Sequence, residues 1–192
     1  MIIEENNIFF DINTLKFIGK NVKIGKTVRI QEPGLVSIGD NTIIDDFTYI
    51  SGEVSIGKYV HIGSSCSLQG GDSRIILKDF VGISAGSRIY ASSSDFLICS
   101  LEFPTIPDKV KFGGYSEEVI LDSFSLIGAN SVVLPGCIVP MGFSIATHTR
   151  LTPFQNMLEW SYYDPYRNGL ITRTGKDVVL KIAKALTGVD YA

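Results

Sequence analysis

The sequence predicts an all-β protein, a parallel β-helix of about six triangular coils. Three observations support this fold class: aliphatic residues recur every six positions, small residues stand two positions before most of them, and glycines follow many of them. A period of six fits neither the 3.6-residue period of an amphipathic helix nor the alternation of a half-buried strand. It is typical of a solenoid in which each hexad supplies one short strand and one turn.

Three hexads close one coil, so the strands form three walls, which we label A, B and C in chain order. The inward aliphatic positions are Ile18, Ile24, Ile30, Ile38, Ile44, Ile50, Ile56, Ile62, Leu68, Leu77, Ile83, Ile89, Leu121, Ile127, Val133, Val139, Ile145 and Leu151. The interval breaks three times, after Ile30, Leu68 and Ile89, and always between a wall C hexad and the next wall A hexad. One edge is therefore expected to carry every excursion, the longest being residues 92–116, and such loops often hold function.

Small or β-branched residues two positions before the inward aliphatics let a narrow prism close without overpacking. They are Val22, Val28, Thr42, Thr48, Val54, Val60, Cys66, Val81, Ser87, Ser125, Ser131, Cys137 and Thr149. Glycines after the aliphatics give the turning backbone its freedom. The small residues, the turn glycines and the six-residue period therefore all predict the same fold.

Composition predicts a single soluble domain without a membrane span. The chain has 192 residues, is 45% hydrophobic and carries a net charge of −3, and no apolar run approaches the roughly 18 residues that a span needs. Its first seven residues contain two glutamates and no basic residue, which does not fit a signal peptide. Three cysteines make a disulfide framework improbable, so we expect a cytoplasmic protein. No basic stripe indicates nucleic-acid binding.

The chain divides into a lead-in (1–17), the β-helix (18–152) and a C-terminal extension (153–192), which is expected to leave the repeat after Leu151. A helix is predicted near residues 176–186, with Thr174 as its cap and Asp177 in its first turn. Its apolar face would comprise Val178, Val179, Ile182, Ala183 and Leu186. The extension is the basic part of the chain, which fits either a solvated helix or contacts to an anionic cofactor.

The repeat over residues 18–152 resembles the left-handed β-helix of the hexapeptide-repeat acyltransferases, and the handedness rests on this resemblance. The string from Ile127 to Gly136 is similar to the signature of sugar and xenobiotic acetyltransferases. Ala129 and Thr147 are 18 residues, one coil, apart and so stack on one edge. The resemblance implies that their backbones contact the pantetheine arm of coenzyme A, with Thr152 beyond them. The alternative is that both are merely small turn residues.

The resemblance implies an acetyltransferase that moves an acetyl group from acetyl-CoA to a hydroxyl, or to an amine, of a sugar, nucleotide sugar or glycan precursor in surface polysaccharide biosynthesis. It also implies a homotrimer with active sites between subunits, and no required metal. His148 and Arg150 are further candidate contacts to coenzyme A, although a solvated turn histidine remains an alternative for His148.

Related acetyltransferases place a catalytic histidine five residues after the aliphatic that opens the long loop, and Ser94 stands there in this chain. A serine hydroxyl alone cannot serve as the base. The strings from Ile89 to Phe96 and from Phe103 to Pro107 are similar to a bacterial polysaccharide acetyltransferase subgroup that carries paired aspartates. This chain keeps only Asp95, which could orient a base, bind sugar hydroxyls or simply cap the loop.

The base must then be one of the two histidines, a carboxylate or the substrate itself. Strand alternation turns His61 outward on wall B, so it could approach Ser94 only across a subunit interface. The candidate catalytic residues are His61, Ser94 and Asp95, and an exposed structural histidine is the alternative for His61. Candidate acceptor contacts are Arg88, Tyr90 and Phe96. An amine acceptor would relax the need for a strong base.

Other classes fit the sequence less well. A γ-type carbonic anhydrase needs three histidines for zinc, and the chain has two. A nucleotidyltransferase needs an additional phosphate-binding α/β domain, for which the chain has neither a glycine-rich loop nor the length. The serious competitor is a non-catalytic binding or structural β-helix with a decayed active site.

Overall fold

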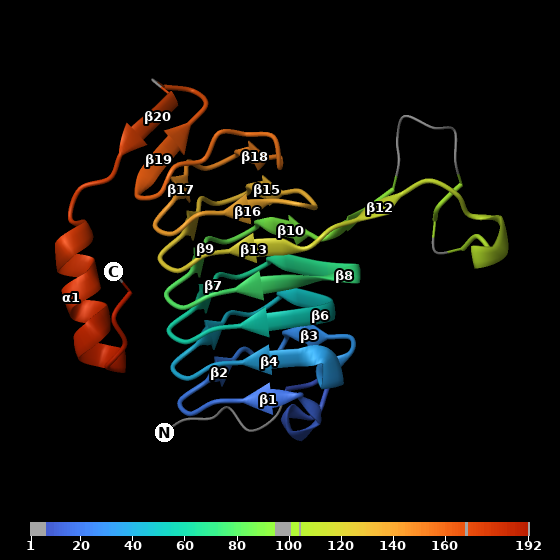
Figure 1. The fold of residues 1–192 in the computed structure, drawn as a ribbon. Coiled ribbons are helices and arrows are strands. Elements are labelled where there is room, and N and C mark those ends of the chain that lie inside the picture. The colour runs from blue at the N-terminus through green and yellow to red at the C-terminus, as the bar shows by residue number, and fades with distance from the viewer. Residues whose placement is uncertain (1–6, 95–100, 104, 168, 192) are drawn as a thin grey trace.

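The computed structural model describes residues 7–94, 101–103, 105–167 and 169–191. The chain winds into a rod of stacked coils with three walls of short parallel strands, and one helix lies along its side (Figure 1). This is the left-handed parallel β-helix that the hexad repeat and the family resemblance predict.

The strands of each wall follow the hexads. Wall A consists of β1 (Phe17–Ile18), β4 (Val36–Ile38), β13 (Val119–Leu121), β16 (Ile138–Val139) and the second halves of β6 (Tyr49–Ile56) and β8 (Ser67–Leu77). Wall B consists of β2 (Lys23–Ile24), β5 (Ile43–Ile44), β7 (His61–Ile62), β9 (Gly82–Ile83), β14 (Leu126–Ile127), β17 (Ser144–Ile145) and β19 (Ser161–Asp164). Wall C consists of β3 (Arg29–Ile30), the first halves of β6 and β8, β10 (Arg88–Tyr90), β15 (Val132–Val133) and β18 (Arg150–Leu151).

The inward aliphatics stack directly on one another from coil to coil. On wall B, for example, Ile44 stands opposite Ile62, and Ile62 stands opposite Ile83. All predicted inward residues are buried except Ile18, which is 36% exposed at the open first coil. Between the walls, small side chains fill the corners, and the Ser87 hydroxyl donates to the Gly128 carbonyl at 3.1 Å. The predicted core is confirmed.

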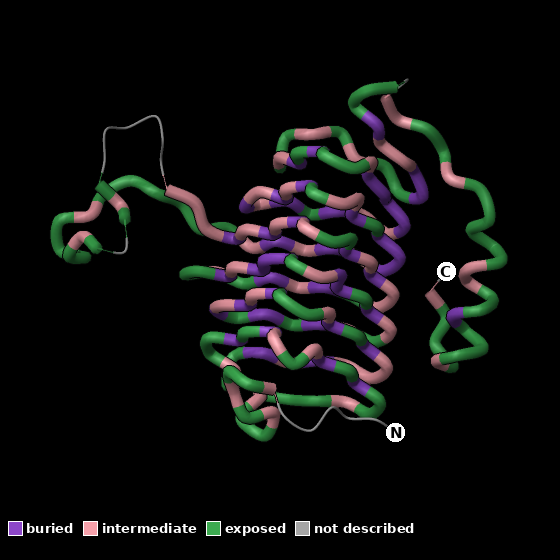
Figure 2. The backbone as a smooth tube through the Cα atoms, turned by 180° about the vertical axis from the view of Figure 1, so that it is seen from behind, coloured by how far each residue is buried: buried purple, intermediate pink, exposed green. Residues whose placement is uncertain are grey.

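Every excursion leaves the corner between walls C and A, as the broken intervals predict. Strands β6 and β8 run through this corner without a break, and the 3-10 helix η2 (Pro33–Leu35) lies there. The longest excursion, residues 92–116, is called the arm. Its β11 (Ser92–Ser93) and β12 (Tyr115–Ser116) pair antiparallel, and η3 (Asp108–Val110) lies farther out. The arm projects away from the rod, and none of its described residues is buried (Figures 1 and 2).

The expectation that the chain leaves the repeat after Leu151 is wrong, because the tail adds part of a seventh coil. Strand β19 pairs parallel to β17, with Tyr163 opposite Ile145, and β20 (Gly169–Thr172) then turns back antiparallel. Tyr163 follows Ile145 by 18 residues and Met157 follows Val139 by 18, and both pack on the core. The repeat continues, but an aromatic and a methionine replace the aliphatic residues that mark it.

Four aromatic rings form a ladder at the corner between walls A and B, comprising Tyr59, Phe80, Phe124 and Trp160. Each of these residues has a positive φ, between 52° and 63°, a conformation that costs roughly 1–2 kcal/mol for a residue with a Cβ. Stacking offsets this cost, since the first three rings lie 5.0 Å apart and within 7° of parallel. Gly142 belongs to the same corner column, and a Cβ there would lie 2.5 Å from the Trp160 ring.

Helix α1 (Lys176–Thr187) packs on this aromatic ladder, close to the predicted bounds. Val179, Leu180 and Ala183 contact the rings, whereas Val178, Ile182 and Leu186 of the predicted apolar face are about half exposed. The prediction that Thr174 caps the helix is wrong, because Gly175, with a φ of 86°, is the N-cap and no side chain caps it. No helix in the described part of the chain is long and apolar enough to cross a membrane.

Replacing Phe124 by Ala should lower the free energy of unfolding by about 3 kcal/mol or more, because it leaves a cavity between three rings without relieving the backbone strain. Urea denaturation followed by circular dichroism measures the change. Phe154→Ala is the matched control, since that ring is 95% exposed and should shift stability by less than about 0.5 kcal/mol. Equal effects of the two substitutions would contradict a structural role for the ladder.

Candidate active site

The corner between walls B and C carries the residues predicted to contact coenzyme A. Strands β14 and β17 are in register, so Ala129 and Thr147 stack one coil apart, as predicted. The backbone N–H of His148 donates to the Ala129 carbonyl at 2.9 Å, and the side chains of Thr147 and His148 are exposed. A Cβ on Gly128 would lie 2.5 Å from the backbone of Ala146, so only glycine fits beneath this corner.

The seventh coil extends the same corner with residues that sequence reasoning did not assign to it. The Tyr166 hydroxyl donates to the His148 carbonyl at 3.3 Å, and Tyr166 follows His148 by 18 residues. Continuing the count of 18 past Leu151 could have found this contact. Arg150 and Thr152 stand at the start and just beyond the end of β18, and Arg150 is exposed.

Wall C presents Arg88 and Tyr90 on the outer face of β10, half-buried. The Arg88 guanidinium is fixed by its Nη1, which donates to the carbonyls of Ser65 at 2.9 Å and Gly86 at 2.6 Å. Tyr90 lies two residues before Ser92, where the arm begins. Both residues therefore point outward beside the arm, where an acceptor could reach them.

Ser94 lies in the arm, just after β11. The hydroxyls of Ser92 and Ser116 are hydrogen-bonded at 2.9 Å and close the base of the arm. At Gly71, where φ is 58°, a Cβ would lie 2.4 Å from the Ser92 Cβ, so this close approach requires glycine. The predicted site residues Asp95 and Phe96 lie outside the described residues.

His61 lies on the outer face of wall B, as strand alternation predicts. Its Nε2 lies 2.9 Å from Oδ2 of Asp45, a partner from the previous coil that the sequence analysis did not identify. Because the register places His61 opposite Ile43, counting two residues past Ile43 could have identified Asp45 as the partner of His61. The pair is about half exposed.

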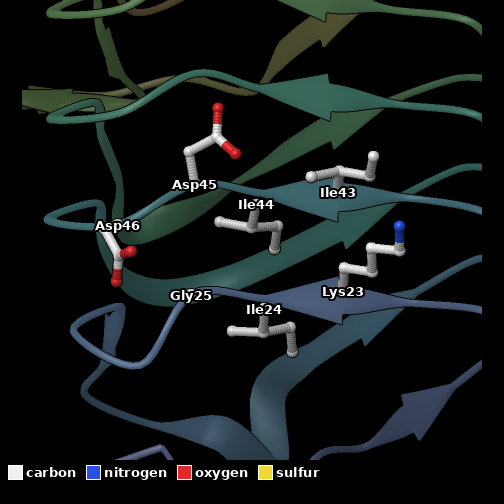
Figure 3. A pocket seen from close by; sticks show the side chains of 7 residues that line it. All are labelled: Lys23, Ile24, Gly25, Ile43, Ile44, Asp45 and Asp46. Carbon is white, nitrogen blue, oxygen red and sulfur yellow. The ribbon is translucent and has the colours of Figure 1, made fainter. Parts of the chain in front are cut away.

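A shallow hollow of about 300 Å³ adjoins this pair on wall B (Figure 3). Lys23, Ile43 and Asp45 contribute side chains to it from neighbouring strands. Asp46, at its edge, accepts hydrogen bonds from the Thr27 side chain and backbone, which lower the pKa of Asp46. The hollow is open, with a mixed polar and apolar lining, and it lies on a different wall from Arg88 and Tyr90.

Within one chain, the predicted catalytic residues His61 and Ser94 do not lie together. His61 projects from wall B, whereas Ser94 leaves the opposite corner, between walls C and A, on an arm that points away from the rod (Figure 1). Among the described residues, no cluster of three His, Cys, Asp or Glu side chains is placed to hold a metal ion. Arg88 and Tyr90 lie close to the base of the arm, and Ala129, Thr147 and His148 lie close together at the corner between walls B and C.

Comparisons with known proteins support acyl transfer. Residues 36–70 match the family described as bacterial transferase hexapeptide (six repeats). The dTDP-4-amino-4,6-dideoxy-D-glucose acyltransferase of Escherichia coli is 31% identical over 133 residues, which cover 68% of each chain.

Solved structures agree over nearly the whole length. AntD, an N-acyltransferase from Bacillus cereus in complex with dTDP and 3-hydroxybutyryl-CoA, has a TM-score of 0.83 and 31% identity, covering 95% of this chain and 98% of AntD. A serine-to-alanine variant of AntD in complex with dTDP-4-amino-4,6-dideoxyglucose and coenzyme A has a TM-score of 0.82 and 32% identity, covering 92% of this chain and 94% of that chain. With this identity, this coverage and the same coil architecture, the chain belongs to the hexapeptide-repeat acyltransferases.

Proposed function

We propose that this chain transfers an acyl group, acetyl or a short 3-hydroxyacyl group, from coenzyme A to the amine of a nucleoside diphosphate sugar. The observation that carries the proposal is the likeness to AntD over 98% of that enzyme's length, including complexes with dTDP, an amino sugar nucleotide and coenzyme A. The Escherichia coli relative, whose name gives a dTDP-amino sugar substrate, supports the same acceptor class.

The chemistry of the arm favours an amine over a hydroxyl. A free amine attacks the thioester carbonyl directly, forming the C–N bond while the C–S bond breaks and the thiol of coenzyme A leaves with a proton. Because the pKa of a sugar amine lies nearer neutrality than that of a hydroxyl, no strong base is required. Ser94 at the usual histidine position fits this route, and we assign Asp95 to orient the attacking amine, accept its proton and pass that proton to the departing thiolate.

Acetyl transfer to a hydroxyl is the second candidate, and the contact between His61 and Asp45 favours it. A carboxylate 2.9 Å from an imidazole orients the ring and supports it as a general base. In this route His61 would act from a neighbouring subunit, since wall B of the same chain faces away from the arm. The two routes therefore differ in whether His61 is a catalytic residue.

The donor would lie along the corner between walls B and C. Exposed Thr147 and half-buried Ala129 leave room there for the pantetheine chain, and His148, Arg150 and Thr152 flank its path. Arg150 would neutralise a phosphate of coenzyme A. Cys66 and Cys137, both free and buried, fit the reducing cytoplasm in which we place the reaction.

The arm supports a homotrimer with shared active sites. Its exposed hydrophobic residues, among them Leu101, Phe103, Val110 and Phe112, are each more than half exposed in one chain. Because the arm points away from its own rod, only another molecule could cover these side chains. Covering them would be favourable, since large exposed apolar patches are typical of interaction surfaces. A second copy would cover the arm and bring its own wall B near Ser94.

Release of free thiol from acyl-CoA, measured with dTDP-4-amino-4,6-dideoxyglucose and with its 4-hydroxy analogue, tests the reaction. The amine should be the substrate, and Asp95→Asn should lower kcat at least about 100-fold, as expected for loss of a proton acceptor. His61→Gln should leave amine transfer unchanged. Transfer to the hydroxyl that depends on His61 would favour the second route, and no transfer to either sugar would favour a decayed site.

Thr147→Trp should abolish the rise in Tm that coenzyme A produces at ligand excess, because the indole would fill the path of the pantetheine chain. Differential scanning fluorimetry measures the shift. Lys20→Trp, an exposed substitution at another corner, is the control and should keep the full shift. An unchanged rise in Tm in Thr147→Trp would contradict donor binding at this corner.

Replacing both Phe103 and Phe112 by Asp should convert the trimer to monomers, because charged groups would then have to be buried between subunits. Light scattering after size-exclusion chromatography gives the mass. Phe154→Asp, at a side chain 95% exposed on the rod, should leave the trimer intact. A wild-type monomer, or a trimer that survives the double substitution, would contradict the assembly.

A further inference from the structure

A cavity of about 250 Å³ lies between helix α1 and the rod, beside the aromatic ladder. Phe80, Phe124 and Leu126 line it from the rod, and Val179 and Ile182 line it from the helix, so its lining is mostly apolar. An apolar cavity of about 150 Å³ is large enough to bind benzene. This cavity therefore has room for an apolar group of roughly six carbons with a polar head. It lies at the edge of wall B opposite to the corner proposed for the donor.

Arg173 supplies a charged group to this lining. It directly follows β20, and its backbone N–H donates to the Trp160 carbonyl at 2.7 Å. Its Nη1 donates to the carbonyls of Gly142 at 2.5 Å and Phe124 at 3.2 Å. In the part of the chain that the structure describes, Nε and Nη2 have no hydrogen-bond partner. The guanidinium is thus held in place while some of its N–H groups stay available to a ligand.

The positive charge at the cavity has no acidic partner. Burial lowers the pKa of Arg173, because desolvation disfavours the charged form. Its guanidinium lies 5.9 Å from the centre of the Trp160 ring, and Nζ of Lys176 lies 5.5 Å from the same centre. Within the described ranges, no carboxylate lies within ion-pair distance of either cation. Two cations beside one ring repel each other, so an anion bound there would be stabilised by both.

Trp160 adds an unpaired donor next to the cavity. The residue is 6% exposed, and the centre of its ring lies 5.5 Å from that of Phe124, which lines the cavity. Its Nε1 is buried and has no hydrogen-bond partner among the described residues. Because a buried indole N–H usually has a partner, this donor is a second, independent indication that an acceptor group belongs in this part of the molecule.

We propose that the cavity between α1 and the rod binds a small monocarboxylate with an apolar body of roughly six carbons. Its carboxylate accepts charge-assisted hydrogen bonds from the unpaired N–H groups of Arg173. Its apolar body lies between Phe124 and Ile182. Because the ligand contacts both the helix and the rod, it stabilises the packing of the C-terminal extension. This site does not depend on the proposed acyl transfer, and it stands or falls separately.

Titration of the intact protein with hexanoate, followed by intrinsic fluorescence, tests the site, because Trp160 is the only tryptophan of the chain. Hexanoate should change the emission saturably, with a Kd of about 1 mM or lower, as expected for a ligand of this size. Acetate has the charge without the apolar body, and 1-hexanol has the body without the charge. Each should bind at least about 10-fold more weakly than hexanoate.

Two substitutions locate the binding. Ile182→Asp should weaken hexanoate binding at least about 10-fold, because it places a negative charge at the cavity, and this side chain is 55% exposed, so the fold should tolerate the change. Arg173→Met should weaken binding to a similar extent by removing the charge-assisted hydrogen bonds, with circular dichroism as the check on folding. Arg74→Met is the matched control, since Arg74 pairs with Glu118 on wall A, and should bind hexanoate as wild type does.

The absence of a saturable change in emission up to about 20 mM hexanoate would overturn the site. Binding that survives both Ile182→Asp and Arg173→Met, or acetate or 1-hexanol that binds as tightly as hexanoate, would do the same. If wild type does not bind hexanoate and Ile182→Asp changes the mass of the assembly in light scattering, this surface belongs to a second copy of the chain and the proposal is wrong.

Discussion

Stacking of the inward aliphatic side chains holds the coils in register, and the outer features of the rod depend on it. A single coil cannot bury its own hydrophobic face, so each coil is stable only against its neighbours. Because Ile44, Ile62 and Ile83 stand directly opposite one another, every corner and every outward position also forms a column. Residues 18 or more positions apart in the sequence are thereby held about 4.8 Å apart. The corner proposed for the donor, where Ala129 and Thr147 stack, arises in this way.

The corners show how the chain manages the strain of tight turns. Asn21, Asn41 and Asn130 adopt the left-handed conformation with side chains that tolerate it. Phe80 and Phe124 also adopt it, although this conformation is unfavourable for a residue with a Cβ. Stacking of the two rings on each other and their packing against α1 offset the cost. The ladder therefore joins the C-terminal helix to the rod, and Gly142 leaves the space that Trp160 needs.

The period of six was sufficient to predict the three walls, the inward residues and the edge that carries the excursions, because one buried column demands one residue type at one interval. It failed where a different side chain filled the same place, as Tyr163 does for an aliphatic residue in the seventh coil. The aromatic ladder was missed for a related reason, since Tyr59, Phe80 and Phe124 do not resemble turn residues. The partner of His61 could be found only by counting across coils to Asp45.

Taken together, the corner between walls B and C, the outward residues Arg88 and Tyr90, and the arm fit an enzyme that brings an acyl donor and a sugar nucleotide together along one rod. The most direct test is mass spectrometry of the product formed from acetyl-CoA and dTDP-4-amino-4,6-dideoxyglucose, before and after treatment with hydroxylamine. The account predicts a sugar nucleotide that carries one added acetyl group and keeps it under hydroxylamine, as an amide does. An acetyl group that hydroxylamine removes, as from an ester, or a sugar nucleotide of unchanged mass, would contradict it.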